Sequence, residues 1–350
     1  MKLLANDSVS CYGGRDEGWN EAILASCSSL RTGCRPATWA RNAHVQNLLT
    51  VTHDGLASIP PWDLDERLVM ADGGTVSIQW LGLAAPPDTP VVVVLHTICG
   101  SGDALRRLVT SLHRRLGWVV AACNRRGHAG LPLTAPQINT MGSTADFRVQ
   151  LDAIVARRPD AALYGIGVSA GSGLLVRYLG EERDRARLRA GVALCPAYDV
   201  PDAFAFVHPH YDAYLTRKLI AFFLEPHRSM LGAVAGFDEG LRASSILEFH
   251  RQVFPLAGYD SLAAYYRGSD PMAVALDITH PILVINAIDD PVCVEANVHR
   301  HLDAMQTLPR MTLAVTRYGS HCGFFDRPLA GSSWSERAIA EYLRAAHRLL

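Results

Sequence analysis

Short apolar runs alternate along this chain with segments in which apolar residues recur every three or four positions. A short unbroken run is typical of a strand buried on both faces of a sheet, and the longer repeat is typical of a helix with one face on a core. The runs predict strands over Val91–Leu95, Trp118–Cys123, Leu163–Val168, Ala190–Cys195, Ile282–Ala287 and Met311–Val315. The repeats predict helices over Leu105–Leu116, Thr144–Ala156, Ala170–Glu182 and Ser333–Leu349. This alternation predicts an α/β fold, with a mostly parallel central sheet and helices on both of its faces.

Two parts of the chain depart from the alternation. Residues 1–55 are polar with weak periodicity, and we expect them to form an irregular N-terminal extension. Residues 199–276 are helical in pattern and rich in Phe and Tyr, which predicts a helical cap inserted between two parts of the core, residues 56–198 and 277–350. We expect the cap to lie over the carboxyl edge of the sheet. Its aromatic side chains either line a substrate pocket or pack the core of the cap, and periodicity does not separate these alternatives.

The composition fits a globular protein and argues against some partners. With 350 residues, 49% of them hydrophobic, the chain is long enough to bury a large core. Its net charge of -1 gives no reason to expect nucleic acid or an anionic membrane as a partner. None of the cysteines forms a C-x-x-C pair, so we expect a reduced cytoplasmic protein without a disulfide framework or a zinc site. We expect no signal peptide and no integral membrane segment, which leaves peripheral contact with a membrane open.

The segment from Gly167 to Gly171 reads Gly-Val-Ser-Ala-Gly and lies between an expected strand and an expected helix. In that context G-x-S-x-G is typical of a nucleophile elbow, a tight turn that presents Ser169 at the carboxyl edge of the sheet. Glycines at both ends remove side chains that would collide where the backbone turns back. The alternative is a glycine-rich turn whose serine caps the following helix.

A serine hydroxyl needs a base within hydrogen-bond distance, and that base needs an orienting carboxylate. In folds with this turn, the partners follow in the order serine, acid, histidine. Asp289 and Asp290 come just after the expected strand Ile282–Ala287, and His321 follows the next strand. We therefore expect Ser169, Asp290 and His321 to form a catalytic triad, with Asp289 as the rival for the acid. The alternative for His321 is a histidine in a surface loop.

The negative charge that develops on an attacked carbonyl oxygen needs two backbone N–H donors. One is expected from Ala170, the residue after the nucleophile, and the other from the loop after Val91–Leu95. In that loop we assign the donor to Ile98, with Thr97 as the rival. His96 is expected to stabilise the loop by hydrogen bonding without taking part in the chemistry. Such a site needs no metal and no organic cofactor.

Several short segments follow one another in a characteristic order. They are Arg41–Leu49, His96–Ser101, Asn124–Gly127, Met141–Asp146, Gly167–Gly173, Tyr178–Glu182, Tyr265–Tyr266, Asn286–Pro291 and His321–Phe324. Together they resemble the motifs of the YheT-like, abhydrolase-domain esterases of the α/β-hydrolase superfamily. The chain departs from the pattern of that family at Thr97, His128 and His250.

The resemblance implies a serine hydrolase that cleaves carboxylic or lipid esters through an acyl-enzyme on Ser169. An alcohol acyltransferase that makes medium-chain esters uses the same triad, and differs in whether water or an alcohol takes the acyl group. A non-catalytic lipid-binding scaffold is the third alternative. The expected partner is a small-molecule acyl ester or lipid, and the chain length, leaving group and oligomeric state are left open.

Overall fold

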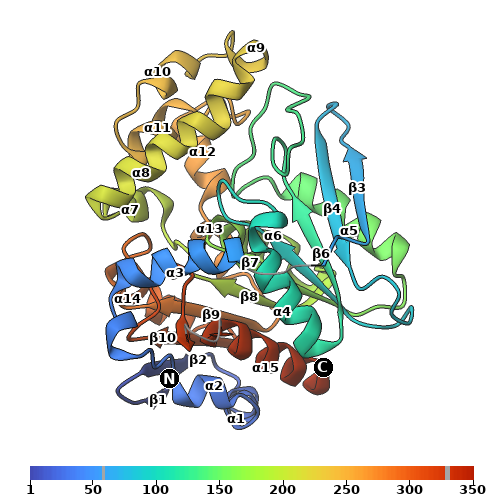
Figure 1. Ribbon diagram of the computed structural model, residues 1–350, viewed down its shortest axis with the longest axis vertical. Coiled ribbons are helices and arrows are strands. Elements are labelled where there is room, and N and C mark those ends of the chain that lie inside the picture. Colours follow the sequence, from blue (N-terminus) through green and yellow to red (C-terminus); the bar gives the residue numbers. More distant parts are fainter. Residues whose placement is uncertain (57–59, 328–331) are drawn as a thin grey trace.

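The computed structural model describes residues 1–56, 60–327 and 332–350, and its centre is a 10-stranded sheet (Figure 1). The strands of this sheet are β1 (Lys2–Ala5), β2 (Val9–Gly13), β3 (Leu64–Val69), β4 (Thr75–Leu81), β5 (Val91–Leu95), β6 (Val119–Asn124), β7 (Leu163–Val168), β8 (Leu188–Leu194), β9 (Ile282–Ala287) and β10 (Met311–Thr316). Their order across the sheet is β1-β2-β10-β9-β8-β7-β5-β6-β4-β3. A separate two-stranded sheet pairs β11 (Phe325–Arg327) with β12 (Ser332–Ser333).

The central strands run parallel, as the sequence predicts. The strands from β6 through β5, β7, β8 and β9 to β10 pair in parallel, and the antiparallel pairs lie toward the two edges. Every residue of β5 is buried, which explains its unbroken run of Val and Leu. Because parallel strands end at the same edge, the segments that follow β5, β7, β9 and β10 meet there, where open α/β sheets bind their ligands.

Helices cover both faces of the sheet. The helices are α1 (Glu17–Ser26), α2 (Ser28–Thr32), α3 (Ala43–Leu56), α4 (Arg106–Leu116), α5 (Thr144–Arg157), α6 (Ala170–Glu182), α7 (Val200–Ala205), α8 (Pro209–Leu219), α9 (Arg228–Leu231), α10 (Phe237–Leu241), α11 (Ile246–Gln252), α12 (Leu262–Ser269), α13 (Met272–Ala275), α14 (Glu295–Met305) and α15 (Trp334–Leu349). α1, α2, α4 and α15 pack on one face, and α5, α6 and α14 pack on the other. None of the helices in the described part of the chain is long and apolar enough to cross a membrane.

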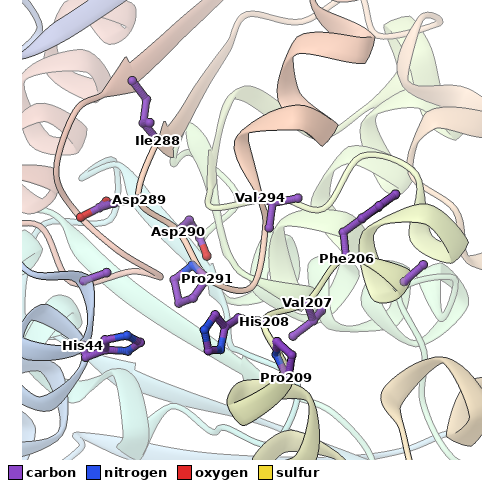
Figure 2. Close-up of a pocket in the computed structure, with 12 residues that line it drawn as sticks. His44, Phe206, Val207, His208, Pro209, Ile288, Asp289, Asp290, Pro291 and Val294 are labelled. Atoms are coloured by element: carbon purple, nitrogen blue, oxygen red, sulfur yellow. The ribbon is translucent and has the colours of Figure 1, made fainter.

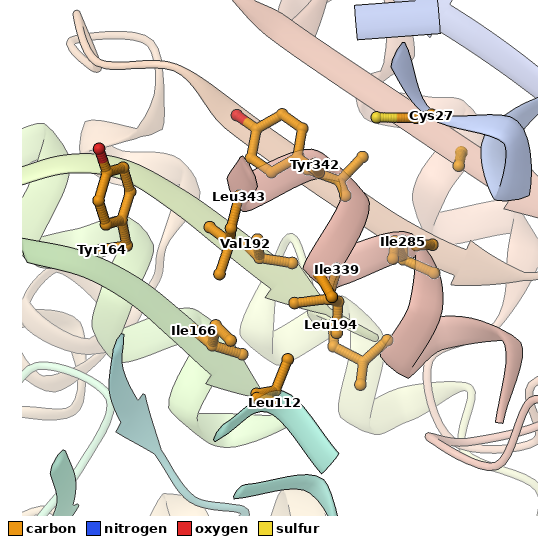
Figure 3. Close-up of a cluster of buried hydrophobic side chains, with 14 of the residues drawn as sticks. Cys27, Leu112, Tyr164, Ile166, Val192, Leu194, Ile285, Ile339, Tyr342 and Leu343 are labelled. Atoms are coloured by element: carbon orange, nitrogen blue, oxygen red, sulfur yellow. The ribbon is translucent and has the colours of Figure 1, made fainter. Parts of the chain in front are cut away.

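Alternate residues of each buried strand supply the two cores on either side of the sheet. In β5, Val92 belongs to the core under α15, and Val91 belongs to the core under α6. Figure 3 shows the first of these cores, in which Ile339 of α15 lies against Val192 and Leu194 of β8. Each fully buried aliphatic side chain of this kind stabilises the fold by about 1.5–3 kcal/mol.

The N-terminal residues are not the irregular extension that their polar pattern suggests. β2 extends the main sheet by pairing antiparallel with β10, with Tyr12 opposite Leu313. Trp19 and Ile23 of α1 and Leu30 of α2 are buried in the core that α15 covers. The expectation is wrong because β2 has only 5 residues and its partner strand lies near the other end of the chain, so local periodicity carries little signal.

Between β8 and β9 the chain forms helices α7 to α13. Helices α7 to α12 lie beyond the carboxyl edge of the sheet, at the top of Figure 1. Their buried side chains, among them Phe223, Phe237, Phe249 and Tyr265, form a hydrophobic cluster together with Leu133 and Ile138 of the segment between β6 and α5. This cluster holds the helices together above the ends of the strands.

Candidate active site

Ser169 lies in a sharp turn between β7 and α6. Its backbone has φ 53° and ψ -118°, a conformation that residues other than glycine rarely adopt. A Cβ at Gly167 would lie 2.3 Å from the carbonyl oxygen of Gly171, and a Cβ at Gly171 would lie 2.3 Å from that of Leu95. Both positions therefore require glycine. Within the described residues the Ser169 side chain caps no N–H group of α6, so the helix-capping alternative is wrong.

Ser169, His321 and Asp290 meet at the carboxyl edge of the sheet. The Nε2 atom of His321 lies 2.8 Å from Ser169 Oγ. The Nδ1 atom of the same ring lies 2.9 Å from Asp290 Oδ2 and 3.2 Å from Oδ1. The three residues follow β7, β9 and β10, which run parallel to β8 and to one another. The His321 side chain is only 16% exposed, which argues against a surface histidine.

The two neighbouring acids have different partners. Asp290 contacts His321, and its Oδ1 also accepts hydrogen bonds from two backbone N–H groups of its own loop, at 2.8 and 2.9 Å. These bonds fix the carboxylate against the imidazole. Asp289 instead accepts a hydrogen bond from the Ser320 N–H at 2.8 Å, and burial raises the pKa of Asp289 to about 6. Asp289 therefore anchors the loop that carries His321, whereas Asp290 orients the ring.

Burial and charge oppose each other at His321. Burial disfavours the imidazolium, but the Asp290 carboxylate and the neighbouring Cys322 favour it, and the pKa of His321 is raised well above its ordinary value. At Cys322, a hydrogen bond with the Cys195 side chain and the positive ring outweigh burial and lower the pKa of the thiol to about 6. The backbone N–H of Cys322 also donates to Cys195 Sγ at 3.3 Å. A thiol with a lowered pKa therefore borders the cavity that also contains Ser169.

Two sets of side chains could hold a metal ion, and both contain His321. In the described part of the chain, the sets are Cys195, His321 and Cys322, and Asp290, Cys293 and His321. In each set the candidate ligand atoms lie within 4.8 Å of one another. Both ring nitrogens of His321 already lie within hydrogen-bond distance of the serine or the aspartate. A metal at either set would compete with these contacts and interrupt the hydrogen-bonded chain.

Ile98 and Ala170, the expected oxyanion donors, both border the cavity that contains the serine and the histidine, and so does Thr97. Ala170 begins α6, so its N–H has no acceptor within the helix. The His96 ring ties the loop down, because its Nδ1 lies 2.8 Å from the Thr97 carbonyl oxygen and its Nε2 accepts the Arg125 N–H at 3.2 Å. His96 thus acts within the loop, as the sequence predicts.

A cavity of about 290 Å³ opens onto Ser169. The cap contributes several of its apolar and aromatic lining residues: Phe204, Tyr211, Tyr214, Leu215, Leu219 and Ile246. Other aromatic residues of the cap, such as Phe237, are buried in its own cluster. Some aromatic residues of the cap therefore line the cavity next to Ser169, and others pack the core of the cap.

A second, more open cavity of about 600 Å³ lies next to the loop that carries the two acids (Figure 2). Asp289 and Asp290 line it from this loop, His44 lines it from α3, and His208 lines it from the start of the cap. Neither the serine nor His321 borders this cavity. The second cavity is therefore not the one that the serine hydroxyl and its histidine partner border.

Gln46 connects α3 to the segment after His321, a role that the sequence does not reveal. Its side chain is fully buried. The Nε2 atom donates to the carbonyl oxygens of Ala40 at 2.7 Å and Phe325 at 3.0 Å, and Oε1 accepts the Phe325 N–H at 2.8 Å. Nearby, His44 Nδ1 lies 2.9 Å from the Tyr211 hydroxyl of the cap. The motif around Gln46 therefore joins the N-terminal part to both the core and the cap.

These features can be compared with those of known proteins. A family model described as the α/β hydrolase fold matches residues 90–328, more than half of the chain. The chain belongs to the α/β-hydrolase-fold family. The fold class and the abhydrolase resemblance expected from the sequence are thereby confirmed.

Of three relatives in this family, two carry enzyme names. Protein ABHD15 of Homo sapiens is 28% identical over 92% of this chain and 70% of its own length. Medium-chain fatty acid ethyl ester synthase/esterase 2 of Saccharomyces cerevisiae is 28% identical over 73% of this chain and 62% of its own length. Phospholipase ABHD3 of Homo sapiens is 23% identical over 94% of this chain and 83% of its own length. Among solved structures, the Pyrococcus furiosus esterase Pf2001 has a TM-score of 0.53 at 18% identity, over 80% of this chain and 89% of that chain, which shows the shared fold.

Proposed function

We propose that this protein is a serine hydrolase that cleaves carboxylic or lipid esters through an acyl-enzyme on Ser169. The observation that carries the proposal is the chain of hydrogen bonds from Ser169 Oγ through His321 to Asp290, at 2.8 and 2.9 Å. Ser169 and His321 border a largely apolar cavity of about 290 Å³. The names of relatives, which include esterase, monoacylglycerol lipase and phospholipase, support the same chemistry.

In the first half of the proposed reaction, His321 Nε2 removes the proton of Ser169 while the serine oxygen attacks the ester carbonyl carbon. Asp290 keeps the ring in position and stabilises its positive charge, in line with the raised pKa of His321. The N–H groups of Ile98 and Ala170 hold the negatively charged oxygen, and each contributes about 3 kcal/mol in comparable sites. His321 then gives its proton to the departing alcohol, and the acyl group stays on the serine.

In the second half, water or an alcohol enters the site vacated by the leaving group. His321 removes a proton from it as its oxygen attacks the acyl carbon. When the bond to Ser169 breaks, the proton returns to the serine oxygen. Water yields a carboxylic acid, whereas an alcohol yields a new ester, so one site supports hydrolysis and acyl transfer.

The apolar cavity favours acyl chains of several carbons. Phe204, Leu215 and Leu219 of the cap line it together with Ile98. Each buried CH₂ contributes about 0.8 kcal/mol, or roughly a fourfold gain in binding. We therefore expect p-nitrophenyl octanoate to be hydrolysed with a kcat/KM at least about tenfold above that of the acetate. Equal values for the two esters would contradict this assignment of the cavity.

Labelling with a fluorophosphonate probe tests the proposal. We expect the folded protein to be labelled on Ser169 and to hydrolyse p-nitrophenyl octanoate, and Ser169→Ala to lose both properties. Ser172→Ala is the matched control. Ser172 is a buried serine three residues after Ser169, and its hydroxyl donates a hydrogen bond to the Ser169 carbonyl oxygen. This variant should retain the label. Absence of both labelling and turnover in the folded wild-type protein would favour the non-catalytic lipid-binding scaffold.

Acyl transfer to an alcohol is the second candidate, and the name of the yeast relative, ethyl ester synthase/esterase, favours it. Product analysis with an octanoyl ester in the presence of ethanol distinguishes the two outcomes. A predominance of ethyl octanoate over octanoic acid at low ethanol concentration would identify an acyltransferase. Octanoic acid as the main product would identify a hydrolase.

A further inference from the structure

Arg125 is a buried arginine without an acidic partner among the described residues. Its relative exposure is 4%, its Nε atom has no hydrogen-bond partner there, and no carboxylate is among the groups that shift its pKa. Burying an unpaired charge is costly, so buried guanidinium groups normally bind carboxylates. The adjacent Arg126 does so, because it bonds Asp146 at 2.6 and 2.7 Å. Arg125 therefore needs another explanation.

The Arg125 side chain donates to the main chain of the loop after β5, which carries Ile98, the expected oxyanion donor. We call this segment, His96–Ser101, the oxyanion loop. Its Nη2 atom lies 2.5 Å from the Thr97 carbonyl oxygen and 3.2 Å from the His96 carbonyl oxygen. The Arg125 backbone N–H donates to Nε2 of the His96 ring, and Nδ1 of that ring lies 2.8 Å from the same Thr97 oxygen and 3.0 Å from Arg125 Nη2. Two side chains thus hold the Thr97 carbonyl group in one orientation.

His128 lies between two carbonyl oxygens, that of Arg126 and that of Ile98, the next residue of the loop. Burial, and after it the charge of Arg125, lower the pKa of His128 to about 3, so the ring is neutral and carries one proton. The Nδ1 atom lies 2.8 Å from the Arg126 carbonyl oxygen and 3.3 Å from the Asn139 side-chain amide, and Nε2 lies 3.0 Å from the Ile98 carbonyl oxygen. Residues that follow β6 therefore contact two successive carbonyl groups of the loop, and Arg125 donates to the first of them.

Peptide geometry turns this restraint into a catalytic consequence. In a trans peptide, the C=O of one residue and the N–H of the next point in opposite directions. Holding the Thr97 oxygen on the buried side therefore turns the Ile98 N–H away from Arg125, toward the cavity that contains Ser169. No backbone acceptor in the described part of the chain takes that N–H. The positively charged guanidinium group also lies on the opposite side of the peptide between Thr97 and Ile98 from the substrate oxygen that becomes negative. The low dielectric of this buried region strengthens the attraction between the two charges.

We propose that Arg125 is a positioning residue that directs the Ile98 N–H at the developing oxyanion. This inference rests on the function proposed above. According to this inference, Arg125, which has no acidic partner among the described residues, increases the rate of acyl transfer and does not contribute to substrate binding. The Arg125 guanidinium does not touch the substrate, and it acts through the peptide between Thr97 and Ile98.

Three variants test this role. Arg125→Met removes both the charge and the donors, and Arg125→Lys keeps the charge but not the planar fork. Arg158→Met is the matched control, because Arg158 is a buried arginine that donates to backbone carbonyl groups, those of Ala85 and Pro86, in the loop before β5. Each variant is assayed with p-nitrophenyl octanoate for kcat and KM, for inhibition by an octyl trifluoromethyl ketone, and for its unfolding midpoint in urea.

We expect Arg125→Met to lower kcat by about 10- to 100-fold while KM changes less than about threefold, since one oxyanion donor is misdirected but not removed. Affinity for the ketone, whose adduct carries the oxyanion, should fall by the same factor. Arg125→Lys should recover part of both losses. Arg158→Met should lower the unfolding midpoint and leave kcat near the wild-type value.

A folded Arg125→Met protein with kcat and ketone affinity within threefold of wild type would overturn the inference, and so would an equal loss of kcat in Arg158→Met. If Arg125→Met does not fold, Arg125→Lys decides, because a folded lysine variant with unchanged kcat and ketone affinity would overturn the inference as well. Wild-type protein that is neither labelled nor active would instead refute the proposed function itself. Active wild-type protein with unaffected Arg125 variants refutes only the positioning role.

Discussion

Replacing Gln46 with leucine tests the connection between the N-terminal helix α3 and the segment after His321. Leucine is similar in size to glutamine, so Gln46→Leu removes hydrogen bonds without leaving a large cavity. Three bonds disappear, those to the carbonyl oxygens of Ala40 and Phe325 and that from the Phe325 N–H, at 2.7, 3.0 and 2.8 Å. At a net value of about 1 kcal/mol each, they predict a loss of about 3 kcal/mol in the free energy of unfolding.

Urea unfolding followed by tryptophan fluorescence measures this loss. Gln137→Leu is the control, because the Gln137 side chain makes one long hydrogen bond, to the Ala257 carbonyl oxygen at 3.3 Å. We expect the control to lose less than about 1 kcal/mol. Because Phe325 lies shortly after His321, Gln46→Leu should also lower kcat while the control does not. A loss below about 1 kcal/mol for Gln46→Leu, or equal losses for the two variants, would refute the reasoning.

Three further predictions concern the site itself. Since the base acts in its neutral form and the pKa of His321 is raised, kcat/KM should increase with pH, with its midpoint above the pKa of an ordinary histidine. Asp290→Asn should reduce kcat strongly and move this rise to lower pH. Gly171→Ala brings a Cβ within 2.3 Å of a backbone oxygen and should abolish activity, whereas Gly173→Ala meets a flexible methionine and should retain most of it. Iodoacetamide should inactivate the enzyme through Cys322 at nearly the same rate at pH 7 and pH 9 and more slowly at pH 5, since the pKa of that thiol is lowered to about 6; a rate that rises steeply from pH 7 to pH 9, as for an ordinary thiol, would contradict the assignment.

Much of the fold follows from patterns that are local in the chain. The Val and Leu run of β5 predicts a strand buried on both faces, and the structure has all five residues buried. The glycines around Ser169 predict a tight turn, and contacts with backbone oxygen atoms explain both of them. Because parallel strands end at the same edge, the order of serine, acid and histidine was enough to predict that Ser169 and His321 lie together with one of the two acids that follow β9.

Other features depend on contacts between distant segments, and local patterns do not carry them. The choice between Asp289 and Asp290 depends on which carboxylate lies within 2.9 Å of His321 and which one accepts the Ser320 N–H. The strand β2 forms because the edge of β10 is available for pairing. The sequence of β2 is too short to predict a strand by itself.

The amino-acid sequence by itself determined the type of fold, the turn that presents the serine and the chemical identity of its partners, because periodicity, glycine placement and residue order act over short distances or through the regular geometry of a parallel sheet. Only the tertiary structure decided which acid lies against the histidine, that Gln46 joins α3 to the segment after His321, and that the Arg125 side chain bonds the Thr97 carbonyl oxygen. These interactions join residues far apart in the chain, and their strength depends on burial and on ångström-scale distances that exist only once the whole chain has folded.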